Sequence, residues 1–155
     1  MKNKIKIRYC KSSELLKIIS LTANAYSVLY KSSTIINKPY ESLERIKNDI
    51  KNGTKILVAE EDGDLVGAVR FNPENLNVLK LNRLAVLSEY RNKGIGGLLI
   101  NSVLKIAKEQ NFRIVAIEVM EEKGLISFYE KFGFKIKDRK KHQNHQDVFM
   151  EKSVR

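Results

Sequence analysis

The chain has 155 residues, and 29 basic against 18 acidic side chains give it a formal net charge of +11 at neutral pH. Its hydrophobic content of 43% is ordinary for a soluble globular protein, and no run of about 18 apolar residues predicts a membrane span. Because the lysines are scattered over nearly every segment, without an RNA-binding aromatic motif, the charge predicts no nucleic-acid partner.

The length and the amino terminus favour one domain in a reducing compartment. A length of 155 residues corresponds to about one domain, so we expect a single domain over residues 1–155. Cys10 is the only cysteine, which excludes an intrachain disulfide. Met1 to Cys10 alternates lysine with isoleucine and lacks the apolar core of a signal peptide. We therefore expect a cytoplasmic location.

The amino-terminal half predicts one strand, two helices and then antiparallel strands. Lys4–Tyr9 alternates with period two, as a strand does. Apolar residues then recur at helical spacing over Leu15–Tyr30 and Glu41–Lys51, with a polar loop expected at 31–40. Asn72-Pro73 is expected to break a strand. The strands expected in this half are Lys55–Glu60, Leu65–Phe71 and Leu79–Leu87.

The carboxyl-terminal half alternates helices with strands. Asp138 to Lys141 is expected to begin a basic, polar turn. His142 and His145 with Asp147 carry metal-ligand chemistry, but no third ligand stands at a fixed spacing, so we expect a solvated turn and no metal. The regular elements expected are a helix that follows the glycine turn and shows an apolar face over Asn101–Gln110, a strand at Phe112–Met120, a short helix at Leu125–Phe132, and strands at Phe134–Lys137 and Asp147–Lys152.

The stretch from Leu84 to Ile100, LAVLSEYRNKGIGGLLI, passes from a strand through a glycine turn into a helix. A helix start presents unpaired N–H groups and the positive end of the peptide dipole. Glycines remove the Cβ atoms that would keep an anion from the backbone. Arg91 and Lys93 add mobile positive charge beside the same turn. The stretch therefore predicts a pocket for a phosphate or pyrophosphate; an ordinary turn before a helix is the structural alternative.

Three phosphate-binding patterns can be compared with this turn. A P-loop requires a lysine after the glycines, whereas Lys93 precedes them, and a dinucleotide fingerprint requires a third glycine where Leu99 stands. The pattern R/Q-x-x-G-x-G/A after a strand ending in Leu-Ala-Val is met in full by Arg91 to Gly96. This is the acetyl-CoA signature of the GNAT superfamily of N-acetyltransferases, and the chain resembles that family. The cofactor-binding residues that the resemblance implies are Leu84, Ala85, Val86, Arg91, Asn92, Lys93, Gly94, Ile95, Gly96 and Gly97.

The second half of the family signature follows at 128–134, where Phe128-Tyr129 precedes Gly133-Phe134. By the resemblance Tyr129 lies near the sulfur of coenzyme A and acts as the general acid. A phenol with a pKa near 10 would protonate a thiolate of pKa about 8.5 uphill by roughly 2 kcal/mol, although a hydrogen bond alone would help. Family members often carry Asn and Ala where this chain has Glu122 and Leu125. The missing Asn affects one hydrogen bond to the cofactor, not the binding of the cofactor itself.

Glu118 is the candidate general base, because it is a lone acid inside the apolar strand Ile114–Val119. Desolvation there would raise its pKa toward the range of a base, and an acid pointing into solvent is the alternative. Ribosomal-protein N-terminal acetyltransferases resemble this segment and carry Glu at the matching position. Other members use a Glu in the strand before the glycine turn, which is absent here; Glu60, Glu61 or a water chain could substitute.

The resemblance implies an α/β (α+β) fold: a mixed, mostly antiparallel sheet with helices on both faces. Strands before and after the glycine turn would be parallel and splay apart, with acetyl-CoA in the V between them. The amine would attack the thioester directly in a ternary complex. The acceptor is expected to be a small-molecule amine, with a peptide amino terminus or a non-catalytic acyl-CoA-binding module as alternatives. The sequence leaves the oligomeric state open, a homodimer included. Tyr26, Tyr30 and Tyr40 are weak candidates for an acceptor site.

Overall fold

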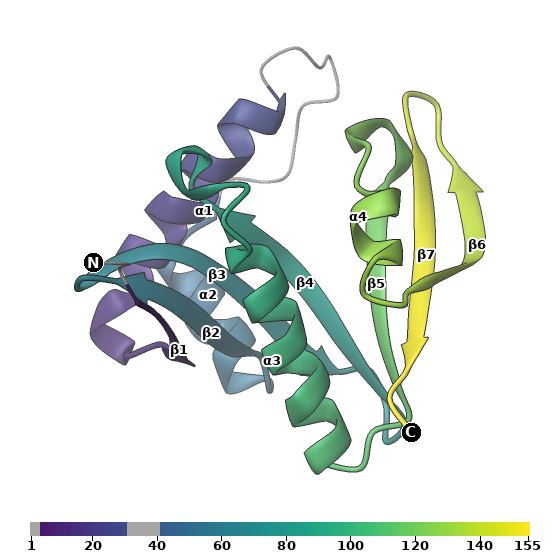
Figure 1. The fold of residues 1–155 in the computed structure, drawn as a ribbon, viewed down its shortest axis with the longest axis horizontal. Helices are drawn as coiled ribbons and strands as arrows, with labels where there is room; N and C mark the ends of the chain where they lie inside the picture. The colour runs from purple at the N-terminus through teal and green to yellow at the C-terminus, as the bar shows by residue number, and fades with distance from the viewer. Residues whose placement is uncertain (1–3, 31–40) are drawn as a thin grey trace.

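The computed structural model describes residues 4–30 and 41–155, which build a sheet with helices on both faces (Figure 1). In the described chain the sheet has seven strands in the order β1-β2-β3-β4-β5-β7-β6. The strands are β1 (Ile5–Tyr9), β2 (Lys55–Glu61), β3 (Asp64–Pro73), β4 (Val78–Val86), β5 (Ile114–Met120), β6 (Lys135–Lys141) and β7 (Gln146–Ser153). The helices are α1 (Leu15–Tyr30), α2 (Leu43–Lys51), α3 (Ile95–Glu109) and α4 (Ile126–Glu130), with short 3-10 turns η1 (Ser12–Glu14), η2 (Ser88–Tyr90) and η3 (Glu121–Lys123).

Every strand pairing is antiparallel except that between β4 and β5, so the predicted mixed, mainly antiparallel sheet is confirmed. The parallel ladder contains only three pairs and ends where Lys80 faces Ala116. Beyond that pair the two strands diverge, as Figure 1 shows. The predicted splaying of the strands on either side of the glycine turn is therefore confirmed.

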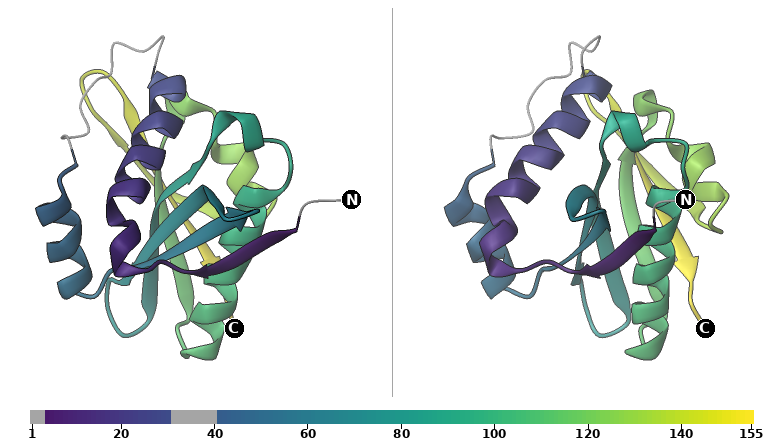
Figure 2. Two further views of the ribbon diagram at one scale, coloured as in Figure 1. Left: turned by 90° about the vertical axis from the view of Figure 1, so that its left-hand side faces the viewer. Right: turned by 60° about the vertical axis from the view of Figure 1, so that its left-hand side comes forward.

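Two apolar clusters hold the helices against opposite faces of the sheet (Figure 2). On one face, the α3 residues Leu99 and Val103 pack with Leu81 and Val115 of the strands, all nearly inaccessible to water. On the other face, α1 and α2 contribute their own buried residues. Alternation along each strand supplies both faces, because successive side chains point in opposite directions. The members of the second cluster are Leu15, Ile18, Leu21, Ala25, Ile46, Ile56, Val58, Ala68 and Ala85.

The carboxyl-terminal hairpin departs from the sequence prediction. Residues 138–141 do not begin a turn: β6 continues to Lys141, which pairs with Gln146 of β7. Charged residues have low intrinsic strand preference, but on an edge strand they are solvated and deter pairing with other chains. Likewise β3 continues to Pro73, at the end of the strand where its missing N–H costs little. Helix α4 is shorter than predicted, and the loop predicted at 31–40 lies outside the described residues.

A partly buried ion cluster fixes the start of α1 to the sheet. Arg8 on β1 forms hydrogen bonds of 2.9 and 2.7 Å with both carboxylate oxygens of Glu14 and one of 3.0 Å with Glu60. The backbone N–H of Lys11 also donates to Glu14, at 2.7 Å. These contacts, the Arg8 hydrogen bonds first, lower the pKa of Glu14 to about 2.

We predict that Glu14→Gln lowers the free energy of unfolding at pH 7 by about 1.5–3 kcal/mol, because charge-assisted hydrogen bonds are lost. The folded pKa of Glu14 lies below its ordinary value of 4.5, so its contribution is present above that value and is lost as pH falls toward 2. Urea unfolding at several pH values tests this. The free energies of unfolding of the mutant and the wild type should converge near pH 2. A difference of the same size at pH 7 and pH 2 would show that ionisation of Glu14 does not cause the destabilisation.

Candidate active site

The end of β4 presents an unpaired backbone edge next to the glycine turn. Val86 and Ala85 pair with Gly67 and Ala68 of β3 on one side, but within the described chain no strand pairs with their other edge. The register with β3 shifts beside Arg83, whose φ of 48° marks a bulge. The Val86 carbonyl on this edge accepts a hydrogen bond from Nε of Arg91, and the rest of the edge, which no strand covers within the described chain, can bind an extended polar ligand lying between β4 and β5.

The glycine turn ends in the amino terminus of α3. Gly94 is the N-cap residue, with φ of 80° and no side-chain cap, and Asn92 before it also has a positive φ of 62°. The first intrahelical bond runs from the Leu98 N–H to the Gly94 carbonyl at 3.0 Å, so the N–H groups of residues 95–97 precede it. Unpaired N–H groups at the start of a 15-residue helix favour an anion.

The three glycines of the turn have different reasons to be glycine. A Cβ on Gly94 would meet nothing within 4 Å, and its left-handed backbone explains the residue. A Cβ on Gly96 would stand 3.3 Å from the ring of Phe128, and one on Gly97 2.9 Å from the ring of Phe132. The absence of side chains at 96 and 97 thus permits close packing of α3 against the segment that contains α4. The sequence alone indicates only the approach of an anion as a reason for these glycines.

Arg91 is held in place, which corrects the prediction of a mobile charge. Its Nε donates to the Val86 carbonyl at 3.2 Å, and a terminal nitrogen donates to the Ala25 carbonyl at 2.9 Å. The side chain therefore ties α1 to the loop between β4 and α3. Lys93 is exposed, with its Nζ 5.2 Å from the centroid of the Tyr90 ring, and supplies the available positive charge beside the turn.

Tyr129 lies on α4 with only 6% of its surface exposed. Its ring makes edge contacts with Phe128 and Phe134, at centroid distances of 5.2 and 5.8 Å. Burial raises the pKa of Tyr129 to about 12. Full proton transfer from such a phenol to a thiolate of pKa about 8.5 would be unfavourable by about 5 kcal/mol. The hydroxyl is therefore better suited to donate a hydrogen bond than to release its proton.

Glu118 is exposed, so the desolvation predicted for its carboxylate is wrong. Its side chain is 38% exposed and one carboxylate oxygen lies 3.6 Å from Nζ of Lys80 on β4. Along β5, Val115, Ile117 and Val119 are buried, whereas Glu118 alternates with them onto the other face. The structure thus matches the alternative left open by the sequence, an acid pointing into solvent.

The fallback acids do not lie at the diverging strands. Glu60 is bound to Arg8 at 3.0 Å, and it lies on β2, which β3 separates from β4. Glu61 pairs with Asp64 at the hairpin turn. Of the tyrosines considered for an acceptor site, Tyr26 packs against the α1 and α2 cluster. The side chains of Tyr30 and Tyr40 lie outside the described residues.

Sequence reasoning missed a buried ion cluster that supports the bulge of β4. Arg70 of β3, with a side chain 3% exposed, forms two hydrogen bonds with the carboxylate of Glu41 just before α2. Nε of Arg83 lies 3.6 Å from the same carboxylate. Burial opposes ionisation of Glu41, but the hydrogen bonds and charges of Arg70, followed by Arg83, outweigh it and lower its pKa. No local pattern in the sequence marks this cluster, because the residues come from three separate elements.

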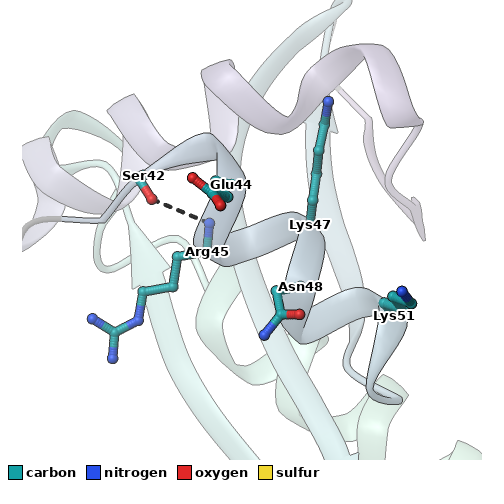
Figure 3. Close-up of a pocket in the computed structure, with 6 residues that line it drawn as sticks. All are labelled: Ser42, Glu44, Arg45, Lys47, Asn48 and Lys51. Atoms are coloured by element: carbon teal, nitrogen blue, oxygen red, sulfur yellow. Dashed lines mark hydrogen bonds between the residues drawn. The ribbon is translucent and has the colours of Figure 1, made fainter.

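A hollow beside α2 does not belong to this site (Figure 3). All six residues that line it are exposed and come from one helix and its N-cap, Ser42, whose Oγ accepts a hydrogen bond from the Arg45 N–H. They include none of the predicted cofactor or catalytic residues. The lining residues are Ser42, Glu44, Arg45, Lys47, Asn48 and Lys51.

The diverging strands and the glycine-led helix are those of an acyl-CoA-dependent transferase fold, and comparison with known proteins agrees. The model of the acetyltransferase (GNAT) family matches residues 19–134, and the chain belongs to that family. The structure of the PaiA N-acetyltransferase from Thermoplasma acidophilum in complex with coenzyme A is similar, with a TM-score of 0.84 and 26% identity, over 97% of this chain and 99% of that one. The ribosomal-protein-alanine N-acetyltransferase from Brucella melitensis shares the fold at a TM-score of 0.76 and 21% identity, over 96% and 99%.

An uncharacterized N-acetyltransferase from Methanocaldococcus jannaschii is 36% identical over 89 residues, covering 53% of this chain and 39% of the relative. The chain thus spans well under half the length of that curated relative. Among the described residues, none of the helices combines the length and apolar character that a membrane crossing requires.

We predict that Gly97→Ala destabilises the fold by about 1–2 kcal/mol, because crowding against Phe132 outweighs the helix preference of alanine. Chemical denaturation provides the free energy of unfolding. The matched control is the same substitution in a Phe132→Leu background, where the penalty should shrink. An equal penalty in both backgrounds would contradict the packing explanation.

Proposed function

We propose that the protein is an acetyl-CoA-dependent N-acetyltransferase that acetylates the primary amine of a small molecule. The observation that carries this proposal is the free edge of β4 beside an uncapped helix start. A thioester-bearing arm needs a polar edge along which to extend, and its pyrophosphate needs N–H donors at one end. Family membership and the coenzyme A named with the Thermoplasma structure support the same cosubstrate.

The pyrophosphate is assigned to the turn from Arg91 to Gly97. Its donors would be the N–H groups at the start of α3, with Lys93 nearby as an exposed cation. Arg91 would act by holding the loop, since its guanidinium is engaged with the carbonyls of Val86 and Ala25. The pantetheine is assigned to the free edge of Leu84 to Val86, where it would replace the missing strand.

In the proposed reaction, the acceptor nitrogen attacks the thioester carbonyl carbon in a ternary complex. The C–N bond forms, the C–S bond breaks, and coenzyme A leaves as a thiolate that takes up a proton. The buried Tyr129 hydroxyl would stabilise the departing sulfur by hydrogen bonding, because its high pKa disfavours full transfer. The proton lost by the amine would pass to Glu118 or to a water chain.

Glu118 retains a place in this mechanism for a different reason than burial. It lies on the face of β5 away from the α3 cluster, and it is accessible to an acceptor or to water. The nearby Lys80 keeps the carboxylate paired in the absence of substrate. An exposed carboxylate can receive a proton through water, although it is a weaker base than a desolvated one.

Acetylation of a peptide amino terminus is the second candidate, and the accessible Glu118 is the observation that favours it. The likeness to the Brucella enzyme adds only the fold at 21% identity. A panel of small amines and peptides, followed by release of free thiol from acetyl-CoA, separates the two acceptor classes. Binding of acetyl-CoA without turnover across the whole panel would instead favour a non-catalytic acyl-CoA-binding module.

We predict that Tyr129→Phe lowers turnover by about a hundredfold or more while leaving acetyl-CoA affinity nearly unchanged. Phenylalanine keeps the edge contacts with Phe128 and Phe134 and removes only the donor. Tyr9→Phe is the matched control, because Tyr9 is 50% exposed on β1. Thiol release and calorimetric binding are measured on the same preparations. Equal turnover of Tyr129→Phe and wild type would remove the hydroxyl from the mechanism.

We predict that Lys93→Glu weakens coenzyme A binding by about tenfold, or 1.4 kcal/mol, through charge repulsion at the pyrophosphate. Lys105→Glu makes the same charge change on an exposed side chain further along α3 and should have little effect. Calorimetry at low and high salt provides the measurement, and the difference should shrink as salt screens it. If both variants weakened coenzyme A binding equally, the effect would come from the net charge of the protein, and the placement of the pyrophosphate near Lys93 would be contradicted.

A further inference from the structure

The hairpin between β6 and β7 brings three metal-ligand side chains into contact. Nε2 of His142 lies 2.8 Å from one carboxylate oxygen of Asp147, and Nε2 of His145 lies 3.4 Å from the other. One ligand atom from each residue lies within 4.8 Å of the other two. The side chains that the sequence assigned to a solvated turn thus form a compact cluster. We propose that His142, His145 and Asp147 form a binding site for a divalent transition-metal ion of the zinc class.

The spacing of the ligand atoms fits a single ion. Four ligands about 2.1 Å from a tetrahedral zinc ion stand about 3.4 Å from one another. His142 and His145 contact different oxygens of Asp147, at 2.8 and 3.4 Å, and one ligand atom from each residue lies within 4.8 Å of the others. Ligand atoms would therefore need to approach one another by at most about 1.4 Å to reach that spacing. The two imidazole rings are stacked, with centroids 4.4 Å apart and planes 16° from parallel. The three protein ligands would leave a coordination position for water or another donor.

The backbone fixes the ligands before any ion binds. The His142 N–H donates to the His145 carbonyl at 2.8 Å and closes the turn. Asp147 lies on β7 between two partners, opposite Lys140 of β6 and Met120 of β5. A carboxylate on a strand paired on both sides and histidines on a closed turn lose little freedom on binding. Preorganisation of this kind favours affinity because less entropy is lost.

Two acidic residues of η3 lie beside the hairpin that carries the cluster. Gln146 donates from its backbone N–H to Glu122 at 2.9 Å and from its side chain to Glu121 at 2.7 Å. Arg139 is drawn to Glu121, with 3.5 Å between its Nε and the carboxylate. These acids offset part of the positive charge of β6 beside the cluster. Two imidazoles with one carboxylate select zinc, cobalt, nickel or copper over magnesium and calcium, which prefer oxygen ligands.

The site lies on the same face of the sheet as Glu118. Directly opposed residues on antiparallel strands share a face, so Asp147 shares one with Met120 and therefore with Glu118 two residues earlier. The opposite face carries Val148 and Met150, which are buried in the α3 cluster. The proposed ion is thus on the sheet face away from α3 and α4. Its binding can therefore be measured independently of coenzyme A.

Zinc titration by calorimetry on protein without a histidine tag provides the test. We expect one ion per chain. A His142→Gln/His145→Gln variant should bind zinc more weakly by more than about a hundredfold, which exceeds the loss expected when only residues that contact the ligands are changed. Cys10→Ser is the matched control, because Cys10 is the only thiol that could bind zinc instead. Its affinity for zinc should equal that of the wild type, and the double variant should keep its affinity for coenzyme A.

A cobalt-binding measurement on the wild type, with Asp147→Asn as a single variant, covers the case in which the double variant fails to fold. Cobalt replaces zinc in such sites, and a tetrahedral site gives intense visible absorption that zinc should displace. The absorption should be absent from Asp147→Asn or strongly weakened there. Lack of one-to-one zinc binding by the wild type, or equal affinity of wild type and double variant, would overturn the proposal. The cluster would then be an ion pair that holds the hairpin.

Discussion

The early end of the parallel ladder between β4 and β5 is the constraint on which the rest of the candidate site depends. After Lys80 and Ala116 the strands separate, and the backbone edge of β4 loses a partner. An unpaired strand edge inside a sheet is unfavourable unless water or a ligand satisfies it. The divergence is accompanied by a bulge at Arg83. The Glu41–Arg70 cluster contacts Arg83 on the sheet face that α1 and α2 cover. The candidate cleft and the bulge therefore lie on the same part of β4.

The loop that follows β4 packs against two other segments and is also the proposed binding site for the pyrophosphate. Gly97 and Gly96 allow α3 to approach Phe132 and Phe128, which places the start of α3 beside the segment that carries Tyr129. Arg91 joins the same loop to α1 through the Ala25 carbonyl. Substitutions in the glycine signature would consequently alter packing as well as the proposed anion binding. Exposed charges such as Lys93 separate the two effects more cleanly.

The environments of the two candidate catalytic groups are opposite to those expected of a general acid and a general base. Tyr129 is buried, and the resulting pKa of about 12 makes it a hydrogen-bond donor rather than a proton source. Glu118 is exposed beside Lys80 and is suited to exchange protons with water. In the proposed reaction this arrangement would place electrostatic stabilisation at the leaving sulfur and leave the amine proton to solvent or to a solvated acid.

The sequence by itself determined the family, the order of most elements and the start of α3, because these follow from hydrophobic period and from short motifs contiguous in the chain. The family and the mixed sheet are confirmed, whereas the roles of Tyr129 and Glu118 stay predictions. Only the tertiary structure decided the burial of each acid, the partners of Arg91, and the extension of β6 through charged residues. It also brought His142, His145 and Asp147 together. These features depend on contacts between residues distant in the chain, or on strand pairing that compensates for poor local preference, and local patterns carry neither.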